Sequence, residues 1–257
     1  MDQETNISQP LKGAVHLSVV SHEQDDLVDQ LLESVASYCQ PDRIVVTVTR
    51  NTRIASKFTF KRFPFPVTVL QNPLPKGFGA NHNQAFTTCR QEYFCVVNPD
   101  IILTSDLFGD LISSLSAENV GVTAPVLVDS DGRLQDSARR YPTPGRIVSR
   151  IYRRKEKEKK YLQGSGPLFP DWVAGMFMLF PAHIYQEMSG FDERYFMYCE
   201  DADICMRLSR RGYKTQLVLQ AQAIHNARRA SHRTMPHLRW HMSSLLRFFF
   251  RYPFYTL

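Results

Sequence analysis

Long apolar runs are absent from this chain of 257 residues, whereas a membrane-spanning helix needs about 18 or more apolar residues in succession. Cysteine is also scarce. The five cysteines stand at irregular spacings without a C-x-x-C pair, which argues against a disulfide framework or a zinc cluster and favours a reducing compartment. Residues 1–13 are polar and acidic, so we expect a disordered N-terminus and no signal peptide.

Acidic residues are missing from the last part of the chain. None follows Asp203, whereas ten Lys or Arg and four His do, and residues 139–160 hold ten Lys or Arg against two Glu. Such basic segments suit phosphates, nucleic acid or an anionic membrane, and a merely solvated basic surface is the alternative. With 43% hydrophobic and 22% charged residues, the chain has the composition of a globular protein with a sizeable core.

The first half of the chain alternates between strand and helix patterns. Apolar, β-branched strand patterns with helical patterns between them occupy residues 14–21, 43–49, 66–72 and 93–103. This order predicts an α/β fold with a Rossmann-like, mostly parallel central sheet and helices on both faces. The second half is less regular: we expect a hairpin near residue 131, a basic mobile loop over 150–167, and helices over 201–211 and 236–252.

Polar residues end the four predicted strands, where ligands of open α/β sheets bind. They are Ser21-His22-Glu23, Thr49-Arg50-Asn51, Gln71-Asn72 and Asn98-Pro99-Asp100. Together they predict a nucleotide cleft, although polar residues also simply mark loops. The "GFG" segment that begins at Gly77 precedes a helix pattern and could approach phosphates closely, but alone it is a weak signal.

Asp100 is the most informative residue of this rim. Pro99 cannot donate to a strand ladder, so the strand ends or bulges there and Asp100 projects from the edge. A carboxylate in that place can hold Mg²⁺ or Mn²⁺ while a diphosphate and waters complete the coordination. The alternative is an Asx-turn residue that only shapes the loop.

Three acids interrupt the core-like stretch "YFMYCEDADICMRL". At helical spacing Asp201 shares a face with Ile204, Cys205 and Leu208, so it should point inward, as a general base or as a buried cap. Asp203 and Arg207 stand at i and i+4, which predicts an exposed ion pair on another face. Glu200 lies at the N-terminal edge, and its role stays open.

The order of these motifs resembles family 2 of the inverting glycosyltransferases, which have the GT-A fold. The motifs are "NPLPKGFGANHNQAF", "VVNPDI", "DWVAGMFMLF", "GFDERYFMYCEDADICMRLSRRGYK" and a later His. The resemblance is closest to bacterial O-antigen rhamnosyltransferases. It implies a single catalytic domain over 14–233, with a nucleotide-binding half (14–110) and an acceptor half (111–233), followed by a basic tail over 234–257.

The resemblance also implies roles for individual residues. Asp201 corresponds to the general base, and Asp100 to the last Asp of the family's metal and diphosphate signature, with His225 completing that site. The nucleotide pocket would be lined by Ser21, Glu23, Asn51, Gly77 and Asp100. The acceptor and donor sugars would meet at Trp172, Gly175 and Glu200. Two departures stand out: Asn98 replaces the first Asp of the signature, which puts the Mg²⁺ or Mn²⁺ dependence in doubt, and Arg50 precedes Asn51 where relatives often have Asp.

The implied activity is transfer of L-rhamnose from dTDP-L-rhamnose to a GlcNAc-diphospho-undecaprenol-type acceptor at the cytoplasmic face of the inner membrane. An enzyme of the same fold that uses a UDP-hexose or galactofuranose donor is the first alternative. A metal-dependent phosphohydrolase that uses Asp100, Glu200, Asp201 and His225 is more remote. A nucleic-acid-binding protein would leave these acids without a use, so we expect no nucleic acid partner.

The last helix pattern is amphipathic as well as basic. Leu238, Met242, Leu245 and Phe249 are predicted to form one apolar stripe, with arginines and Trp240 on other faces. This is typical of a helix that lies on an anionic membrane without crossing it. The alternative is a helix packed on the catalytic domain.

Overall fold

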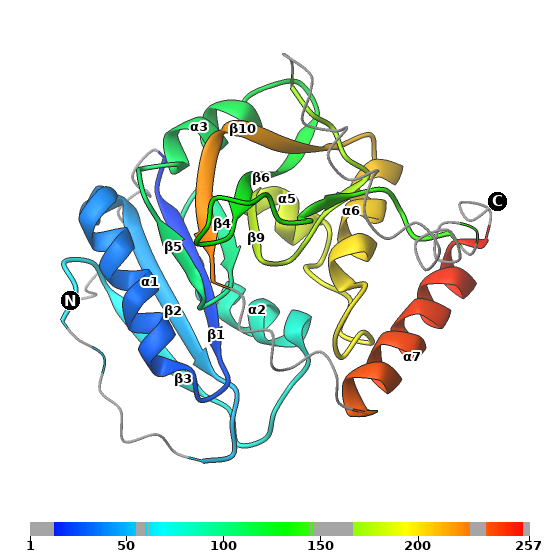
Figure 1. Ribbon diagram of the computed structural model, residues 1–257, viewed down its shortest axis with the longest axis horizontal. Coiled ribbons are helices and arrows are strands. Elements are labelled where there is room, and N and C mark those ends of the chain that lie inside the picture. The colour runs from blue at the N-terminus through cyan, green and yellow to red at the C-terminus, as the bar shows by residue number, and fades with distance from the viewer. Residues whose placement is uncertain are drawn as a thin grey trace, which may run out of the picture.

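A central sheet of eight strands organises the computed structural model, in the spatial order β3-β2-β1-β4-β9-β6-β10-β5 (Figure 1). The structure describes residues 13–54, 60, 62–143, 145, 167–226 and 235–253. Residues 1–12 of the expected disordered N-terminus and residues 150–166 of the expected basic loop lie outside the described part of the chain. The strands are β1 (Val15–Ser21), β2 (Ile44–Arg50), β3 (Val67–Gln71), β4 (Tyr93–Val97), β5 (Ile101–Leu103), β6 (Val120–Val128), β9 (Phe177–Pro181) and β10 (Lys214–His225).

Most of the sheet is parallel, as predicted. Strands β3, β2, β1 and β4 run parallel to one another, and β6 runs parallel to β10. Strand β9 is antiparallel to both of its neighbours, and β5 is antiparallel to β10. A second, two-stranded sheet pairs β7 (Ala138–Arg139) with β8 (Trp172–Val173).

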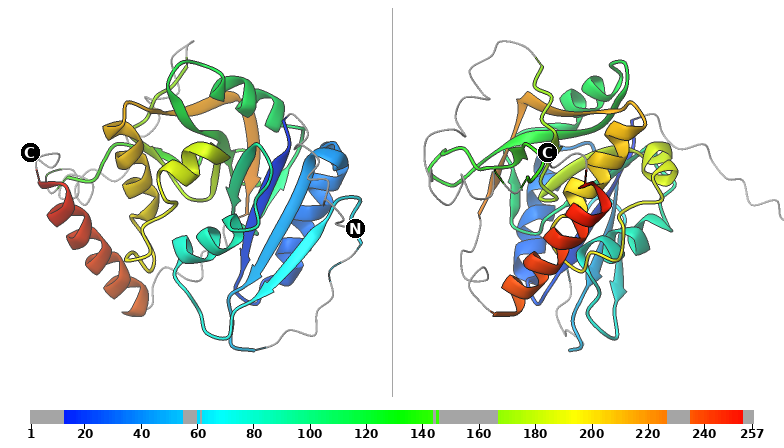
Figure 2. Two further views of the ribbon diagram at one scale, coloured as in Figure 1. Left: turned by 180° about the vertical axis from the view of Figure 1, so that it is seen from behind. Right: turned by 90° about the vertical axis from the view of Figure 1, so that its right-hand side faces the viewer.

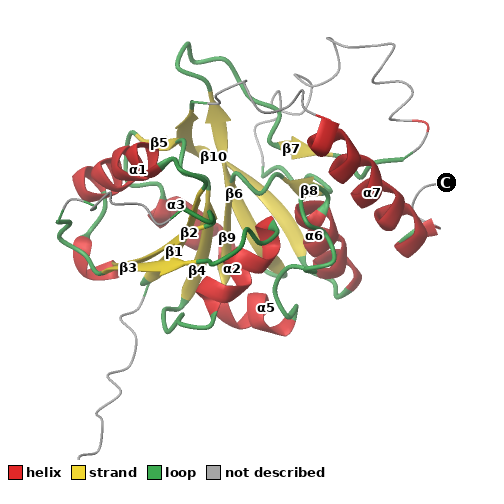
Figure 3. Cartoon of the chain, turned by 90° about the horizontal axis from the view of Figure 1, so that it is seen from below, coloured by secondary structure: helices red, strands yellow, loops and turns green. Residues whose placement is uncertain are grey.

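Helices cover both faces of the central sheet (Figure 3). On one face lie α1 (Asp25–Tyr38) and α3 (Phe108–Leu115); on the other lie α2 (Phe78–Phe86), α5 (Ala182–Glu187) and α6 (Glu200–Arg210). Strand β4 shows why its sequence is apolar throughout: Cys95 faces the first helical layer and Phe94 faces the second. Alternate side chains of a central strand therefore enter two different cores.

The last helix, α7 (Met235–Arg251), packs its inner side against the second core. Phe248 is fully buried there, and the Ser244 hydroxyl donates a hydrogen bond of 2.8 Å to the Met197 carbonyl. The prediction of one common apolar stripe was wrong, because Leu245 is buried whereas Met242 is exposed. The right-hand view of Figure 2 shows α7 in front, lying along the region of α6.

Asp203 is fully buried, which corrects the expectation of an exposed ion pair. The predicted partner is right: Arg207 Nε donates to Asp203 Oδ2 at 2.8 Å. The other carboxylate oxygen accepts a hydrogen bond of 2.7 Å from the Tyr252 hydroxyl, and Arg251 lies 3.2 Å away. The i, i+4 spacing of Asp203 and Arg207 is visible in the sequence, but the cover that α7 provides is not, and this cover removes Asp203 from water.

Tyr252→Phe tests this packing, since it removes one hydrogen-bond donor from a buried carboxylate and leaves the ring in place. We expect the free energy of unfolding to fall by about 1.5–3 kcal/mol, the usual contribution of a hydrogen bond to a charged group. Urea unfolding measures the change, with Tyr38→Phe on the exposed side of α1 as the matched control. Equal stability of the two variants would contradict the buried network.

Candidate active site

The carboxyl ends of β1 to β4 meet at one rim, and the predicted polar residues lie along it. Ser21 stands opposite Arg50 in the pairing of β1 with β2, and Arg50 stands opposite Gln71 in the pairing of β2 with β3. Beside β1, strand β4 ends at Val97 and leads into Asn98 and Asp100. Parallel register therefore collects residues from distant parts of the sequence at the place where ligands of such sheets bind.

The side chains of Ser21 and Asn51 form hydrogen bonds with other residues of the rim and of the loop before α2. The Ser21 hydroxyl donates to Asp25 at 2.8 Å, and Arg50 lies 3.1 Å from the same carboxylate. Asn51 is bonded to both backbone groups of Lys76, at 2.8 and 2.7 Å. These two residues therefore shape the rim and hold the loop before α2.

Glu23 is the exposed acid of the rim. Its backbone has a φ of 61°, in the left-handed region, and its carboxylate accepts a hydrogen bond of 2.9 Å from Thr52. An exposed carboxylate at this edge can accept hydrogen bonds from the base or ribose of a nucleotide.

Gly77 connects the rim to the loop that precedes α6. A Cβ at this position would lie 2.7 Å from the backbone carbonyl oxygen of Phe196, and the next amide, that of Phe78, donates to that oxygen at 2.8 Å. The absence of a side chain is therefore required by the close approach of two protein backbones. This close packing is a reason for the glycine that is independent of the predicted approach to phosphate.

Asp201 lies half-buried in the first turn of α6, with its carboxylate directed to the turn at Gly175. Its Oδ2 accepts a hydrogen bond of 3.1 Å from the Gly175 amide, and its Oδ1 accepts one of 2.8 Å from the Ala202 amide. Burial raises the pKa of Asp201 above its ordinary value, while the two amides and the positive charge of Arg139 oppose that rise. The carboxylate is thus a stronger base than a solvated Asp and is still supported as an anion.

Gly175 is tied to this arrangement by its own lack of a side chain. A Cβ there would lie 2.9 Å from the Phe78 ring. On the next residue, the Met176 carbonyl accepts a hydrogen bond of 2.9 Å from the Asn98 amide. The turn at 175–176 therefore contacts both the end of β4 and the start of α6.

The backbone that leads into α6 is strained. Tyr198 and Cys199 have φ angles of 73° and 65°, in the left-handed region that side chains other than glycine disfavour. The hydroxyl of Tyr198 lies within hydrogen-bonding distance, 2.9 Å, of His237 on α7. Strain of this kind gathers at functional sites, where the surrounding contacts hold it in place.

Glu200 is buried directly beside Asp201. Its side chain is 5% exposed, and Oε2 accepts no hydrogen bond from any residue that the structure describes. Burial first, and then the charge of Asp201, raise the pKa of Glu200 well above its ordinary value. Burial therefore favours the protonated form of Glu200, whereas the two amide donors favour the negative charge on Asp201.

Asp100 and His225 come together as predicted, because β5 pairs antiparallel with β10. Nε2 of His225 lies 3.3 Å from Oδ1 of Asp100, which is buried and accepts no hydrogen bond within the described part of the chain. Gln135 donates its amide to the His225 carbonyl at 2.7 Å, which places its Oε1 on the Nδ1 of the same histidine. In the neutral imidazole the proton then sits on Nδ1, and the lone pair of Nε2 faces the carboxylate.

A lone pair and a carboxylate oxygen that face each other suit a divalent cation. Two protein ligands leave positions for diphosphate oxygens and water, as Mg²⁺ prefers. Within the described ranges, no group of three or more His, Cys, Asp and Glu is placed to hold a metal. The residues therefore fit a cation that arrives with a nucleotide diphosphate better than one held by the protein alone.

Two residues of this site were missed by the sequence reasoning. Arg139 stands opposite Trp172 in the small sheet, with its guanidinium 5.1 Å from the indole centre, and its charge acts on Asp201. Trp172 itself is buried and donates to the Arg140 carbonyl at 2.9 Å. The second missed residue is Gln135, which orients His225. The basic run over 139–160 could have pointed to Arg139, whereas nothing in the sequence singles out Gln135.

A family model described as "Glycosyltransferase like family 2" matches residues 13–243, most of the chain. The chain belongs to glycosyltransferase family 2. It is a glycosyltransferase, which confirms the enzyme class that the motifs implied. In the part of the chain that the structure describes, no helix has the length and apolarity to cross a bilayer.

Curated relatives include the rhamnosyltransferase WbbL of Escherichia coli K12, which is 27% identical over 248 residues, covering 92% of this chain and 93% of the relative. The N-acetylglucosaminyl-diphospho-decaprenol L-rhamnosyltransferase of Mycobacterium tuberculosis H37Rv is 29% identical over 146 residues, which cover 52% of this chain and 47% of that protein.

Solved structures at low identity share the fold, which is of the GT-A type as expected. GalNAc-T7 with UDP, GalNAc and Mn²⁺ has a TM-score of 0.64 at 13% identity, covering 91% of this chain and 47% of that one. The mannosyltransferase PcManGT of Pyrobaculum calidifontis with GDP-Man and Mn²⁺ has a TM-score of 0.61 at 13% identity, covering 92% and 64%. The chain thus spans about half to two thirds of these proteins.

Proposed function

We propose that this glycosyltransferase moves L-rhamnose from dTDP-L-rhamnose, with inversion, onto a lipid-linked GlcNAc-diphosphate acceptor, with Asp201 as the general base. The observation that carries the proposal is the Asp201 carboxylate, bound by the Gly175 amide where the nucleotide rim meets α6. The names of the curated relatives support the sugar and the acceptor class. A UDP-hexose or galactofuranose donor is the competing possibility for the same site.

In the proposed reaction Asp201 takes the proton from the acceptor hydroxyl as its oxygen attacks the anomeric carbon. The raised pKa of Asp201 makes this carboxylate a better proton acceptor than a solvated Asp. Burial and the charge of Asp201 raise the pKa of Glu200 well above its ordinary value, which disfavours a second charge beside the base. Attack from the face opposite the diphosphate inverts the anomeric centre, so dTDP-β-L-rhamnose gives an α-L-rhamnoside, and one carboxylate is enough.

Departure of the nucleoside diphosphate requires positive charge. Asp100 and His225 would hold Mg²⁺ or Mn²⁺, which when bound supplies that charge to the diphosphate. Within the chain itself, Arg139 stands near Asp201 and Trp172 and can orient an anionic group. Glu23 on the rim is suited to the nucleoside, with Ser21, Asn51 and Gly77 shaping its pocket.

A polyprenyl-diphosphate acceptor places the proposed reaction at the cytoplasmic face of the inner membrane, in the synthesis of O-antigen or another cell-surface polysaccharide. The enzyme would be peripheral there, with no nucleic acid partner. The phosphohydrolase alternative needed a joint metal set from Asp100, Glu200, Asp201 and His225, and it finds no support because the described residues form no such set of three.

Asp201→Asn tests the base directly. We expect the rate of transfer to fall by about 10²–10⁴-fold, the usual contribution of a general base, with donor affinity nearly unchanged because the amide keeps the shape of the carboxyl. The assay supplies dTDP-rhamnose, UDP-glucose or UDP-galactose with a GlcNAc-diphospho-lipid, and Asp26→Asn on the exposed side of α1 is the control. Full activity of Asp201→Asn would refute the base, and use of UDP-hexoses alone would refute the donor.

Removal of the divalent cation tests the metal site proposed at Asp100 and His225. We expect EDTA to abolish tight binding of dTDP, and Mn²⁺ to restore it in the unmodified protein but not in His225→Ala. Gln135→Leu should weaken Mn²⁺ binding in the presence of dTDP by about 10–100-fold, since it releases the orientation of the histidine. Titration calorimetry measures both, with His183→Ala on the exposed side of α5 as the control. Metal-independent dTDP binding would overturn this assignment.

A further inference from the structure

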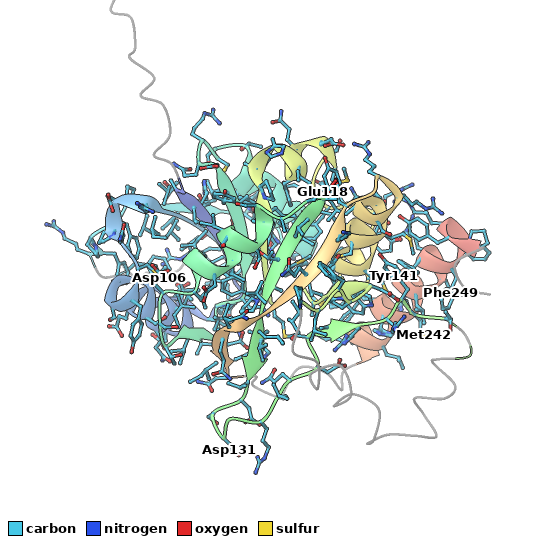
Figure 4. The ribbon with its side chains drawn as sticks, turned by 90° about the horizontal axis from the view of Figure 1, so that it is seen from above. Asp106, Glu118, Asp131, Tyr141, Met242 and Phe249 are labelled. Carbon is cyan, nitrogen blue, oxygen red and sulfur yellow. The ribbon has the colours of Figure 1, made fainter. Side chains whose placement is uncertain are left out.

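The outer side of α7 carries a ridge of exposed apolar side chains. Leu238, Met242, Leu246 and Phe250 recur every four residues and are 58%, 48%, 50% and 83% exposed. Figure 4 shows Met242 on this helix at the edge of the molecule. The buried residues of the helix, Ser244 and Phe248 among them, lie on the opposite side. Packing of α7 on the domain therefore accounts for its buried inner residues but not for the apolar character of its four exposed residues.

Arginines adjoin this ridge. Leu246 and Phe250 line a hollow of about 580 Å³ together with Arg194, Arg247 and Arg251. Arg194 and Arg251 both contact the carboxylate of Asp192, whereas Arg247 lies over the ring of Tyr195 at 5.9 Å. The helix itself contains no acidic residue. The hollow thus combines a net positive charge with aliphatic and aromatic walls.

We propose that this ridge and hollow dock on the surface of a bilayer that contains anionic phospholipid. Leucine, methionine and phenylalanine side chains can enter the acyl boundary while arginines at the same level bind lipid phosphates. The helix has 17 residues and arginines along its length, so it lies in the interface. A second copy of the chain fits less well because two basic faces would meet, and nucleic acid would make no use of the aliphatic ridge.

The inner side of the same helix reaches the segment that carries the proposed base. Ser244 holds the Met197 carbonyl, and His237 contacts Tyr198, two residues before Glu200. Docking through the ridge would therefore place the start of α6 close to the headgroups, where the diphosphate of a lipid-linked acceptor lies. The purpose of the docking rests on the proposed function, but the docking itself is a property of the surface and is measured without substrate.

The test is sedimentation of the full chain with vesicles of phosphatidylcholine alone or with about 30% phosphatidylglycerol. We expect binding to the anionic vesicles that weakens with salt. It should fall by at least about tenfold in Leu246→Ser/Phe250→Ser and in Arg247→Gln. Matched controls are Val69→Ser on the outermost strand β3 and Arg43→Gln in the turn before β2, both exposed and remote from α7. Leu238→Ser/Met242→Ser is the second apolar variant if the first does not fold.

Unchanged vesicle binding by the folded ridge variants would overturn the proposal, as would equal binding to neutral and anionic vesicles. A dimer in solution that the ridge variants abolish would show that a second copy occupies the surface instead. Transfer to a water-soluble GlcNAc-diphosphate acceptor separates this inference from the proposed function. The ridge variants should keep that activity. If the proposed donor or the proposed base is wrong, this activity is missing from the unmodified protein or survives in Asp201→Asn, and vesicle binding is unaffected in either case.

Discussion

The turn at Gly175 and Met176 joins the end of β4 to the start of α6, and the proposed chemistry depends on the hydrogen bond that the Gly175 amide donates to Asp201. This turn also bonds to Asn98 at the end of β4, so the rim at the strand ends and α6 are held by one short segment. The bond also opposes the rise in the pKa of Asp201 that burial causes. The Gly175 amide therefore both positions the Asp201 carboxylate and stabilises its negative charge.

Helix α7 is a second constraint on α6 and on the segment that precedes it. Burying Asp203 would be unfavourable without partners, and α7 with the residue after it supplies Arg251 and Tyr252 to a carboxylate that Arg207 already binds. The same helix contacts Tyr198, whose left-handed backbone leads into Glu200. The C-terminal helix is thus part of the framework of the site, and any partner on its outer side lies one helix away from the proposed base.

Much of this could be predicted from the sequence, because strand ends and helical phase are local properties. Parallel strands predicted the rim, and the i, i+3, i+4 spacing predicted that Asp201 faces the core. The burial of Asp203 could not be predicted, since helical phase does not show what covers the other side of a helix. The packing of Gly77 could not be predicted for a similar reason: its neighbour, the Phe196 backbone, lies far away in sequence. The role of Gln135 arises only when β10 brings His225 beside it.

The central claim is that Asp201, and not its buried neighbour Glu200, acts as the general base. The dependence of the transfer rate on pH, at saturating donor, tests it most directly. Protonation of the base removes activity, so the rate should fall as the pH decreases through a single pKa above 3.8, the ordinary value for Asp. This acid limb should persist in Glu200→Gln and disappear from the residual activity of Asp201→Asn. An acid limb that disappears in Glu200→Gln and persists in Asp201→Asn would contradict the account.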